Sequence, residues 1–374
     1  MALYKSLVKK VSIPADKKTK QKEYEEVGQL AIIDQGKKLI GGYTNNLNMQ
    51  LECTLPVIIF GDHTCAVKYV DFSFGAGADG IKVLSPKDEV LPKYLFYGTQ
   101  YLTLRFPDRG YARHYQHIEK MDLRLPELEE QLRIVNRIEE LFSELDKGVE
   151  TLQIIKQQLE VYRQAVLREA FASLHDKIRI RNLSSMVTSG SRGWAKYYNE
   201  EGARFIRITD LTRNHIKLKN NAIQRVRLPQ NVEGRRSRLH GGDVLISITA
   251  DLGSIAVIPN SIEESYINQH IAVVRFNNAY QGKFMAWYLR SDYGQKDLLK
   301  NKRGGGKLGL GLDDIRNTVV PVVNNELADR IVEEIESRLS VCDSIDQTVD
   351  TALLQAEAMR QSILKKAFEG ELSE

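Results

Sequence analysis

Two long stretches of the chain repeat their hydrophobic positions every seven residues. In the first, one repeated position is occupied by Ile138, Leu145, Leu152, Leu159 and Val166, and the other by Ile134, Leu141, Gly148, Ile155 and Tyr162. In the second, the corresponding positions hold Ile335, Cys342, Val349, Ala356 and Ile363, and Ile331, Arg338, Ile345, Ala352 and Met359. A period of seven maintained over several heptads is typical of coiled-coil helices. The pattern therefore predicts two long helices, each with two core positions.

The two heptad stretches are copies of each other. Ile134–Phe171 aligns without a gap onto Ile331–Phe368, and Arg163 falls on Arg360. The core residues of the second copy are smaller, so large residues facing small ones would fill a shared seam at normal packing density. We therefore predict that the two helices pack antiparallel within one chain. Parallel homodimerisation through each copy is the alternative.

Outside the helices, short apolar runs bounded by glycine, proline and polar residues are typical of strands. In the first half they predict strands at Pro56–Phe60, Ala66–Val70 and Gly80–Leu84, and a helix at Leu91–Tyr101. In the second half they predict strands at Arg204–Ile208, Asp243–Thr249, Ile255–Pro259 and Ile271–Phe276, and a helix at Phe284–Arg290. The expected fold class is α+β, with two globular mixed α/β domains separated by two long helices that form an antiparallel coiled coil. The expected segments are 1–125, 126–175, 176–320 and 321–374.

Charge divides along the same segments, although the 374 residues carry a net charge of only +4. The globular segments hold 18 Lys and Arg against 14 Asp and Glu, and 24 against 13. The helical segments hold 6 against 10, and 5 against 12. Basic domains alternating with acidic helices indicate where a polyanion can bind.

The composition is that of an ordinary folded protein. No apolar run approaches the roughly 18 residues of a membrane span, and the start lacks the features of a signal peptide. Three cysteines without metal-ligand spacing indicate a reducing compartment. We expect a cytoplasmic protein without a membrane partner.

Several short motifs resemble catalytic or cofactor-binding motifs, but the residues around them do not fit those functions. The glycines of Phe74–Gly80 fit G-x-G-x-x-G but lead into an apparent strand, where a dinucleotide site needs a helix. Gly306-Lys307 lacks the remainder of a phosphate-binding loop, and Asp62-His63 is interpreted as a turn. The metal-binding Glu-x-Lys of common nucleases is absent, Asp-x-Lys occurs only at Asp16-Lys17-Lys18, and no Pro-Pro of an adenine methyltransferase motif occurs. We predict that the chain is not an enzyme.

The order of motifs around the two helices resembles the specificity subunit of Type I restriction–modification systems. The helical part of the resemblance lies in Leu125–Gln131, Gln131–Phe171 and Ile363–Leu372. The globular part lies in Ile32–Thr44, Pro56–Thr64, Tyr111–Gln116, Thr188–Trp194, Phe205–Leu211, Gly241–Val257 and Ile267–Arg275. Met1–Lys22 departs from the usual short entry into the first strand.

This resemblance implies a non-catalytic subunit that recognises a bipartite double-stranded DNA target. Each globular domain would be a target recognition domain, and the helices would set the spacing of the two half-sites. The implied partners are two methyltransferase subunits and restriction subunits. No cofactor is expected on this chain, because S-adenosylmethionine, ATP and Mg would belong to the partner subunits. A coiled-coil structural protein that binds nucleic acid or protein without sequence specificity is the alternative.

Candidate DNA-contacting residues lie in polar loops rich in groups that bind base edges or phosphates. Arg, Asn and Gln donate to base edges, whereas Lys, Arg and backbone N–H groups bind phosphate. In the first domain the candidates are Lys37, Lys38, Tyr43, Asn45, Asn46, Arg109, Tyr111, Arg113 and His114. In the second they are Ser191, Arg192, Arg207, Arg213, Gln269, Arg303 and Lys307.

Overall fold

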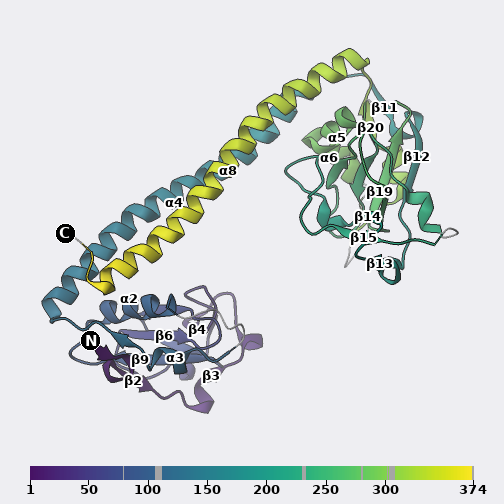
Figure 1. The fold of residues 1–374 in the computed structure, drawn as a ribbon. Coiled ribbons are helices and arrows are strands. Elements are labelled where there is room, and N and C mark those ends of the chain that lie inside the picture. Colours follow the sequence, from purple (N-terminus) through teal and green to yellow (C-terminus); the bar gives the residue numbers. More distant parts are fainter. Residues whose placement is uncertain are drawn as a thin grey trace. The chain divides into compact units, whose positions relative to one another are not determined.

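The computed structural model describes residues 1–78, 80–105, 112–229, 233–278, 281–300, 302 and 308–372. The chain forms two compact units, each with one globular module and part of both long helices (Figure 1). Unit 1 is Met1–Gln153 with Asp350–Glu374, and unit 2 is Ile154–Val349. Each unit combines a module with parts of both long helices, whereas the sequence predicted four consecutive segments. The bounds of those four segments stay a prediction. Within the described residues, no helix is both long and apolar enough to cross a membrane.

Module 1 is built from two four-stranded sheets. The antiparallel sheet has the order β2 (Val8–Val11), β9 (Ile81–Pro86), β6 (Val57–Gly61) and β7 (Val67–Val70). The mixed sheet has the order β3 (Lys18–Thr19), β8 (Phe74–Gly77), β4 (Leu30–Ile33) and β5 (Gly42–Thr44). A short pair joins β1 (Ala2–Leu3) to β10 (Asp122–Leu123), and the helices are α1 (Tyr4–Leu7), α2 (Pro92–Thr103) and α3 (Tyr115–Ile118).

Module 2 repeats this plan. Its antiparallel sheet has the order β12 (Ser184–Ser189), β19 (Ile271–Phe276), β16 (Val244–Ser247) and β17 (Ile255–Val257). Its mixed sheet has the order β13 (Tyr198–Asn199), β15 (Gln224–Val226), β14 (Ala203–Ile206) and β18 (Ser265–Ile267). A short pair joins β11 (Lys177–Arg179) to β20 (Val319–Pro321), and the helices are α5 (Gly282–Arg290), α6 (Asp292–Leu299) and α7 (Leu312–Asn317).

The two modules share the topology of their antiparallel sheets. Strands β2, β9, β6 and β7 correspond in order and direction to β12, β19, β16 and β17. In the mixed sheets, β4 pairs antiparallel with β5 and parallel with β8, as β14 pairs with β15 and β18. Helix α2 follows β9 as α5 follows β19. Equivalent positions in the two modules can therefore be compared directly.

The sequence pattern predicted the central strands and helices to within a few residues. Strand β6 is buried along its whole length, which explains its continuous apolar run. Pro92 stands at the start of α2, where its fixed φ and missing N–H are tolerated. The pattern missed most of the mixed sheets, whose strands of two to four residues are too short for a period to show. It also missed that Met1–Lys22 forms β1, α1, β2 and β3 of module 1.

The long helices are α4 (Leu128–Phe171) and α8 (Asn325–Glu369). In unit 2, Arg338 of α8 donates to Glu169 of α4 (Nη1 to Oε2, 2.8 Å). Asp343, which comes later on α8, accepts a hydrogen bond from Arg163, which comes earlier on α4. Residue numbers thus rise on one helix as they fall on the other, so the predicted antiparallel pairing within one chain is confirmed.

The seam between the helices is narrower than predicted. The first heptad position of α8 is buried at Ile335, Cys342, Val349 and Ala356. The second position was predicted to be core, but Ile345 and Met359 are 40% and 56% exposed. On α4, Gly148 and Tyr162 at this second position are also exposed. The prediction of two core positions per helix is therefore wrong for much of the second position.

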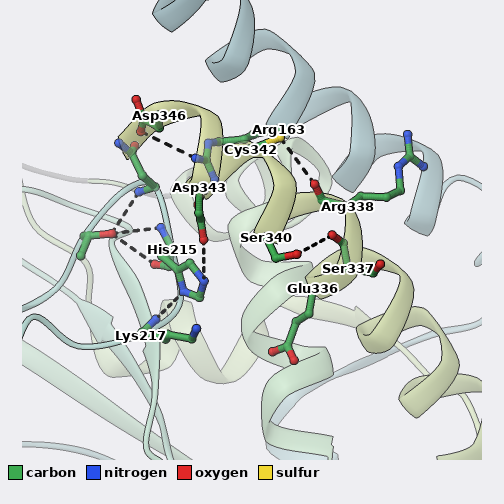
Figure 2. Close-up of polar contacts among 12 residues, drawn as sticks. Arg163, His215, Lys217, Glu336, Ser337, Arg338, Ser340, Cys342, Asp343 and Asp346 are labelled. Atoms are coloured by element: carbon green, nitrogen blue, oxygen red, sulfur yellow. Dashed lines mark hydrogen bonds and ion pairs between the residues drawn. The ribbon is translucent and has the colours of Figure 1, made fainter. Parts of the chain in front are cut away.

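An ion pair closes this seam in the same way in both units. In unit 2, Arg163 donates to Asp343 (Nη1 to Oδ1, 2.6 Å) and lies 3.7 Å from Asp346 (Figure 2). In unit 1, Arg360 donates to Asp146. Arg163 and Arg360 are equivalent in the repeat, and so are Asp146 and Asp343. The repeat therefore pairs reciprocally with itself, each copy giving the arginine once and the aspartate once.

A phenylalanine ends each copy of the repeat and anchors it in a module. In unit 1, the Phe368 ring packs on Tyr94 and Tyr101 of α2, with centroids 4.9 and 5.4 Å apart. In unit 2, the Phe171 ring packs on Phe284 and Tyr288 of α5, with centroids 5.7 and 5.3 Å apart. Both phenylalanines are about 3% exposed. Within each unit, the helical seam and the module therefore share one core.

We expect Arg163→Ala to destabilise unit 2 by about 1–3 kcal/mol, because it leaves Asp343 without its nearest cation and removes a mostly buried side chain. Hydrogen exchange of α8 amides in unit 2 measures this loss. Arg137→Ala is the matched control, since Arg137 makes an exposed pair with Glu140 one turn away, and its effect should stay below about 0.5 kcal/mol. Equal effects of the two substitutions would contradict the role assigned to Arg163.

His215 gives unit 2 a pH-dependent contact. Its Nδ1 accepts a hydrogen bond from the Lys217 backbone (3.0 Å), and its Nε2 lies 3.8 Å from Asp343 (Figure 2). Burial lowers the pKa of His215, Lys217 and Arg163 lower it further, and Asp343 and Glu336 oppose them. The neutral imidazole is therefore the form that the fold favours.

Because this pKa is depressed on folding, the unfolded chain takes up the proton first as the pH falls. The contribution of His215 to stability should be complete above its ordinary pKa near 6.5 and should decline as the pH falls below that value. Urea denaturation between about pH 8 and pH 5 measures the decline. In His215→Gln this part of the pH dependence should disappear. An unchanged pH profile in the variant would show that other groups cause it.

Candidate nucleic-acid interface

The polar loops of module 2 meet in a hollow of about 690 Å³, here called hollow 2. It is lined by Ser189, Gly190, Ser191, Arg192, Arg236, Thr249, Gln269 and His270. Apart from Arg236, which lies in the short 3-10 helix Glu233–Ser237, these residues stand where β12 and β16 end and where β19 begins. Residues from four separate loops therefore face one another around the end of the antiparallel sheet.

Glycines fix the shape of the loop that carries Arg192. A Cβ at Gly190 would lie 2.0 Å from the Ile267 carbonyl oxygen, so only glycine allows this close approach. Gly193 has φ of 77°, which glycine adopts without strain. Trp194 then turns inward and stacks against Phe205, with ring centroids 4.6 Å apart. Arg192 is held between these fixed points, and its side chain is exposed at the hollow.

A chain of side-chain hydrogen bonds crosses hollow 2. Thr249 Oγ1 lies 2.7 Å from His270 Nδ1, and His270 Nε2 lies 2.9 Å from Gln269 Nε2. If the Gln269 amide donates, the imidazole carries its proton on Nδ1 and donates to Thr249. Gln269 is thereby oriented by its neighbours, as a side chain that reads a base edge must be.

The chain returns to hollow 2 just after the predicted basic loop. Gly309 pairs with Thr249, and the Leu310 N–H donates to the Ile248 carbonyl (3.0 Å). The predicted loop residues Arg303 and Lys307 lie outside the described residues, as do Arg109 and Tyr111 in module 1.

Module 1 has a hollow of about 860 Å³ at the corresponding place, here called hollow 1. It is lined by the end of β2, the turn after β6, the start of β9, the segment before α3, and residues of β3 and β8 from the mixed sheet. Its cationic lining residues are Lys10, Lys18, Lys82 and Arg113. The two hollows thus occupy equivalent positions and are both basic, although they share few residue types.

Asp62 and His63 serve the structure of hollow 1. Asp62 is 4% exposed, its Oδ1 accepts from the Tyr115 N–H (2.9 Å), and its Oδ2 lies 3.6 Å from Lys82 Nζ. His63 Nδ1 lies 3.1 Å from the Ala112 carbonyl. Both residues stand in a turn after β6, as the sequence indicated. The G-x-G-x-x-G motif leads from β8 into β9 and not into a helix.

The structure brings together only some of the predicted contact residues. Ser191, Arg192 and Gln269 line hollow 2, and Arg113 lines hollow 1. Lys38 and Tyr43 line a separate hollow beside Glu25 and Glu26. Lys37 is exposed and lies in neither hollow, and His114 is buried.

Other predicted contact residues are committed to bonds within the module. Arg207 donates to the Ala222 carbonyl (2.8 Å) and lies 3.4 Å from Asp210. Arg213 donates to Asp251 (2.7 Å) and to the Leu252 carbonyl (2.8 Å). These guanidinium groups hold loops in place, and a role for them in DNA contact stays a prediction.

Asn45 and Asn46 likewise bond within module 1. Asn45 accepts from Gln29 (3.2 Å) and donates to Glu25 (2.6 Å), and Asn46 accepts from the Asn48 N–H (3.1 Å). A role for them in DNA contact also stays a prediction.

The sequence interpretation missed several residues of the hollows. In hollow 2 these are Arg236, Thr249 and His270, and in hollow 1 they are Lys10, Lys18 and Lys82. The one feature of the sequence that could have indicated them is that most of them lie in or next to an apolar strand. Among the described residues, no three His, Cys, Asp or Glu side chains gather as metal ligands would.

A family model for the Type I restriction modification DNA specificity domain matches residues 9–160 and 194–351. The chain is 26% identical over 284 residues to the Type I restriction enzyme EcoBI specificity subunit of Escherichia coli, an alignment that covers 67% of this chain and 58% of the relative. It is 24% identical over 272 residues to the EcoKI specificity subunit of Escherichia coli strain K12, covering 68% and 58%. The matches thus span somewhat over half the length of these relatives.

Likeness to solved structures supports the fold. A chain from the structure described as "Structural basis underlying complex assembly and conformational transition of the type I R-M system" superposes with a TM-score of 0.69. The superposition covers 99% of this chain and 97% of that chain at 18% identity. At this identity the likeness concerns the arrangement of the backbone alone.

Proposed function

The chain belongs to the Type I restriction modification DNA specificity family, and from this premise we propose that it is the sequence-specific DNA-binding subunit of a restriction–modification assembly. The observation that carries the proposal is the pair of topologically equivalent basic hollows, one in each module. Two similar scaffolds with different lining residues suit a target made of two different half-sites. The acidic helices are poorly suited to DNA, so each module supplies its own contact surface.

Within this proposal, hollow 2 binds one half-site through two kinds of contact. Arg192 and Arg236 supply cationic groups for phosphates or guanine edges, and Gln269 is held by His270 as a reader of an adenine edge. Hollow 1 offers mainly lysines, which bind phosphate as point charges. The remaining predicted contact residues, Arg303 and Lys307 among them, would add further contacts to the DNA.

The partners follow from the same proposal. The relatives are named as specificity subunits of Type I restriction enzymes, so this chain would position two methyltransferase subunits and restriction subunits on DNA without catalysing their reactions. S-adenosylmethionine, ATP and Mg would then belong to those partners. The reciprocal pairing of the helical repeat supports two equivalent partner positions, because it presents related helix faces beside each module.

The proposal predicts a large specificity ratio. At about 0.15 M salt, one bipartite duplex should bind at least ~10³-fold more tightly than random duplex of the same length, with methyltransferase subunits present. Selection from a random duplex library followed by titration of the enriched sequence measures the ratio. Equal affinity for all duplexes would favour the alternative of a structural protein that binds nucleic acid without specificity.

Gln269→Ala should relax the preference at one base pair at a cost of about 1–3 kcal/mol, because an amide donor and acceptor are lost from hollow 2. Affinities for the selected site and its single-base variants measure this change. Arg168→Ala is the control, since Arg168 lies on α4 paired with Asp292 and away from the hollow. A uniform loss at all sequences would assign Gln269 to the phosphate backbone instead.

Adding one helical turn should change the spacing and leave the half-sites unchanged. Four residues, about one turn, would be inserted after Gly148, where an added Cβ would meet no other atom within 4 Å, together with four in the facing part of α8. Library selection with the altered chain reports both half-sites and the gap. A change in the half-sites with the gap retained would reject the spacer role.

A further inference from the structure

The helical repeat places equivalent residues beside both modules. The space between the module helix and the long helix is occupied by a loop in unit 2 and is open in unit 1. In unit 2, the His215 ring packs against Trp287 of α5, with ring centroids 5.4 Å apart. Its Nε2 also lies 3.8 Å from Asp343 of α8, which holds Arg163 (Figure 2). A loop of module 2 therefore fills the space between the module helix and the long helix.

In unit 1 the same space is an open groove of about 500 Å³, here called the α2–α4 groove. Tyr97 of α2 stands where α5 has Trp287, and Asp146 of α4 is the repeat equivalent of Asp343. All residues that line the groove come from α2, α4 and α8. Among the described residues, no loop of module 1 lines it.

The difference originates in one loop length. His215 is carried by Arg207–Ile223, which connects β14 to β15. The equivalent connection in module 1, from β4 to β5, is Asp34–Gly41 and is less than half as long. Its Asp34 is turned toward Lys68, whose Nζ donates to the Asp34 carbonyl (2.7 Å). Within the described part of module 1, this short connection therefore supplies no counterpart of the His215 segment.

The groove offers aromatic and acidic groups. Its aromatic wall is Tyr97 against Phe142, with ring centroids 5.7 Å apart and planes at 80°. Glu139, Asp146 and Glu150 bring three carboxylates, of which Glu139 pairs with Lys93 (2.7 Å) and Asp146 with Arg360. Lys147 also lines the groove, and Arg360 lies 4.3 Å from the Phe142 ring. An imidazole or ammonium group entering here would meet a ring and a carboxylate, as His215 does in unit 2.

We propose that the α2–α4 groove is the docking site for a basic loop of a protein partner, whose chemistry is that of His215-Ile216-Lys217. A protein loop fits, because a protein loop fills the equivalent position in unit 2. With Lys147 and Arg360, the lining side chains carry a net charge of −1, which favours a cationic loop over a phosphate backbone. The proposal rests on the proposed function only in that the chain works within a multiprotein assembly.

A fluorescent peptide with the sequence of residues 211–219 is the probe, titrated against the full chain by anisotropy. We expect saturable binding that weakens at least tenfold with Glu150→Lys, which reverses a groove charge, and with Ser143→Trp, which fills the groove. Glu144→Lys is the matched control on the same helix, because Glu144 is exposed and does not line the groove. A peptide with alanine in place of the histidine should also bind at least tenfold more weakly.

Absence of saturable binding, or binding that both groove variants leave unchanged, overturns the proposal. Circular dichroism and urea denaturation establish that each variant is folded. Sequence-specific DNA binding is measured separately on the same variants and should be unaltered. A chain that binds the peptide in the groove but discriminates no DNA sequence would reject the proposed function and leave the docking site in place.

Discussion

The reciprocal ion pair between the two helical copies is the constraint on which the architecture depends. Arg163 with Asp343 and Arg360 with Asp146 are one interaction made twice, because the residues are equivalent in the repeat. Only an antiparallel pairing in a single register allows both bonds. Neither pair is wholly buried, so each contributes modest free energy, and its main effect is to specify the register of a seam whose second heptad position is largely exposed.

That register determines where each module is attached. Phe171 and Phe368 end the two copies and enter aromatic sites on α5 and α2. The modules share the topology of their antiparallel sheets, so each basic hollow lies at the same strand ends of its own module. The scaffold is thus duplicated while the chemistry is not: hollow 1 is rich in lysine, and hollow 2 combines arginine with a Gln269–His270–Thr249 chain. This combination suits the family's DNA specificity and a target with two unlike halves.

The two modules differ in the length of one loop, the connection from β14 to β15 or from β4 to β5. This difference decides whether the space between the module helix and the long helix is filled. The long connection in module 2 places His215 between Trp287 and Asp343, whereas the short connection in module 1 leaves Tyr97 and Asp146 at an open groove. The filled site is sensitive to pH because the pKa of the partly buried His215 imidazole is lowered there. The open site keeps Glu150 exposed to a partner.

The sequence by itself determined the features that depend on local periodicity. Heptads specify α4 and α8, and continuous apolar runs specify strands such as β6 and β19, because burial of a regular element repeats at its own period. The sequence also indicated polar candidates such as Arg192 and Gln269. Only the tertiary structure decided which candidates meet. Hollow 2 joins Arg236, Thr249 and His270 from separate loops, while Arg207 and Arg213 turn to partners inside the module. No local pattern encodes such choices, since each guanidinium is bound by whichever acceptors the fold brings within reach.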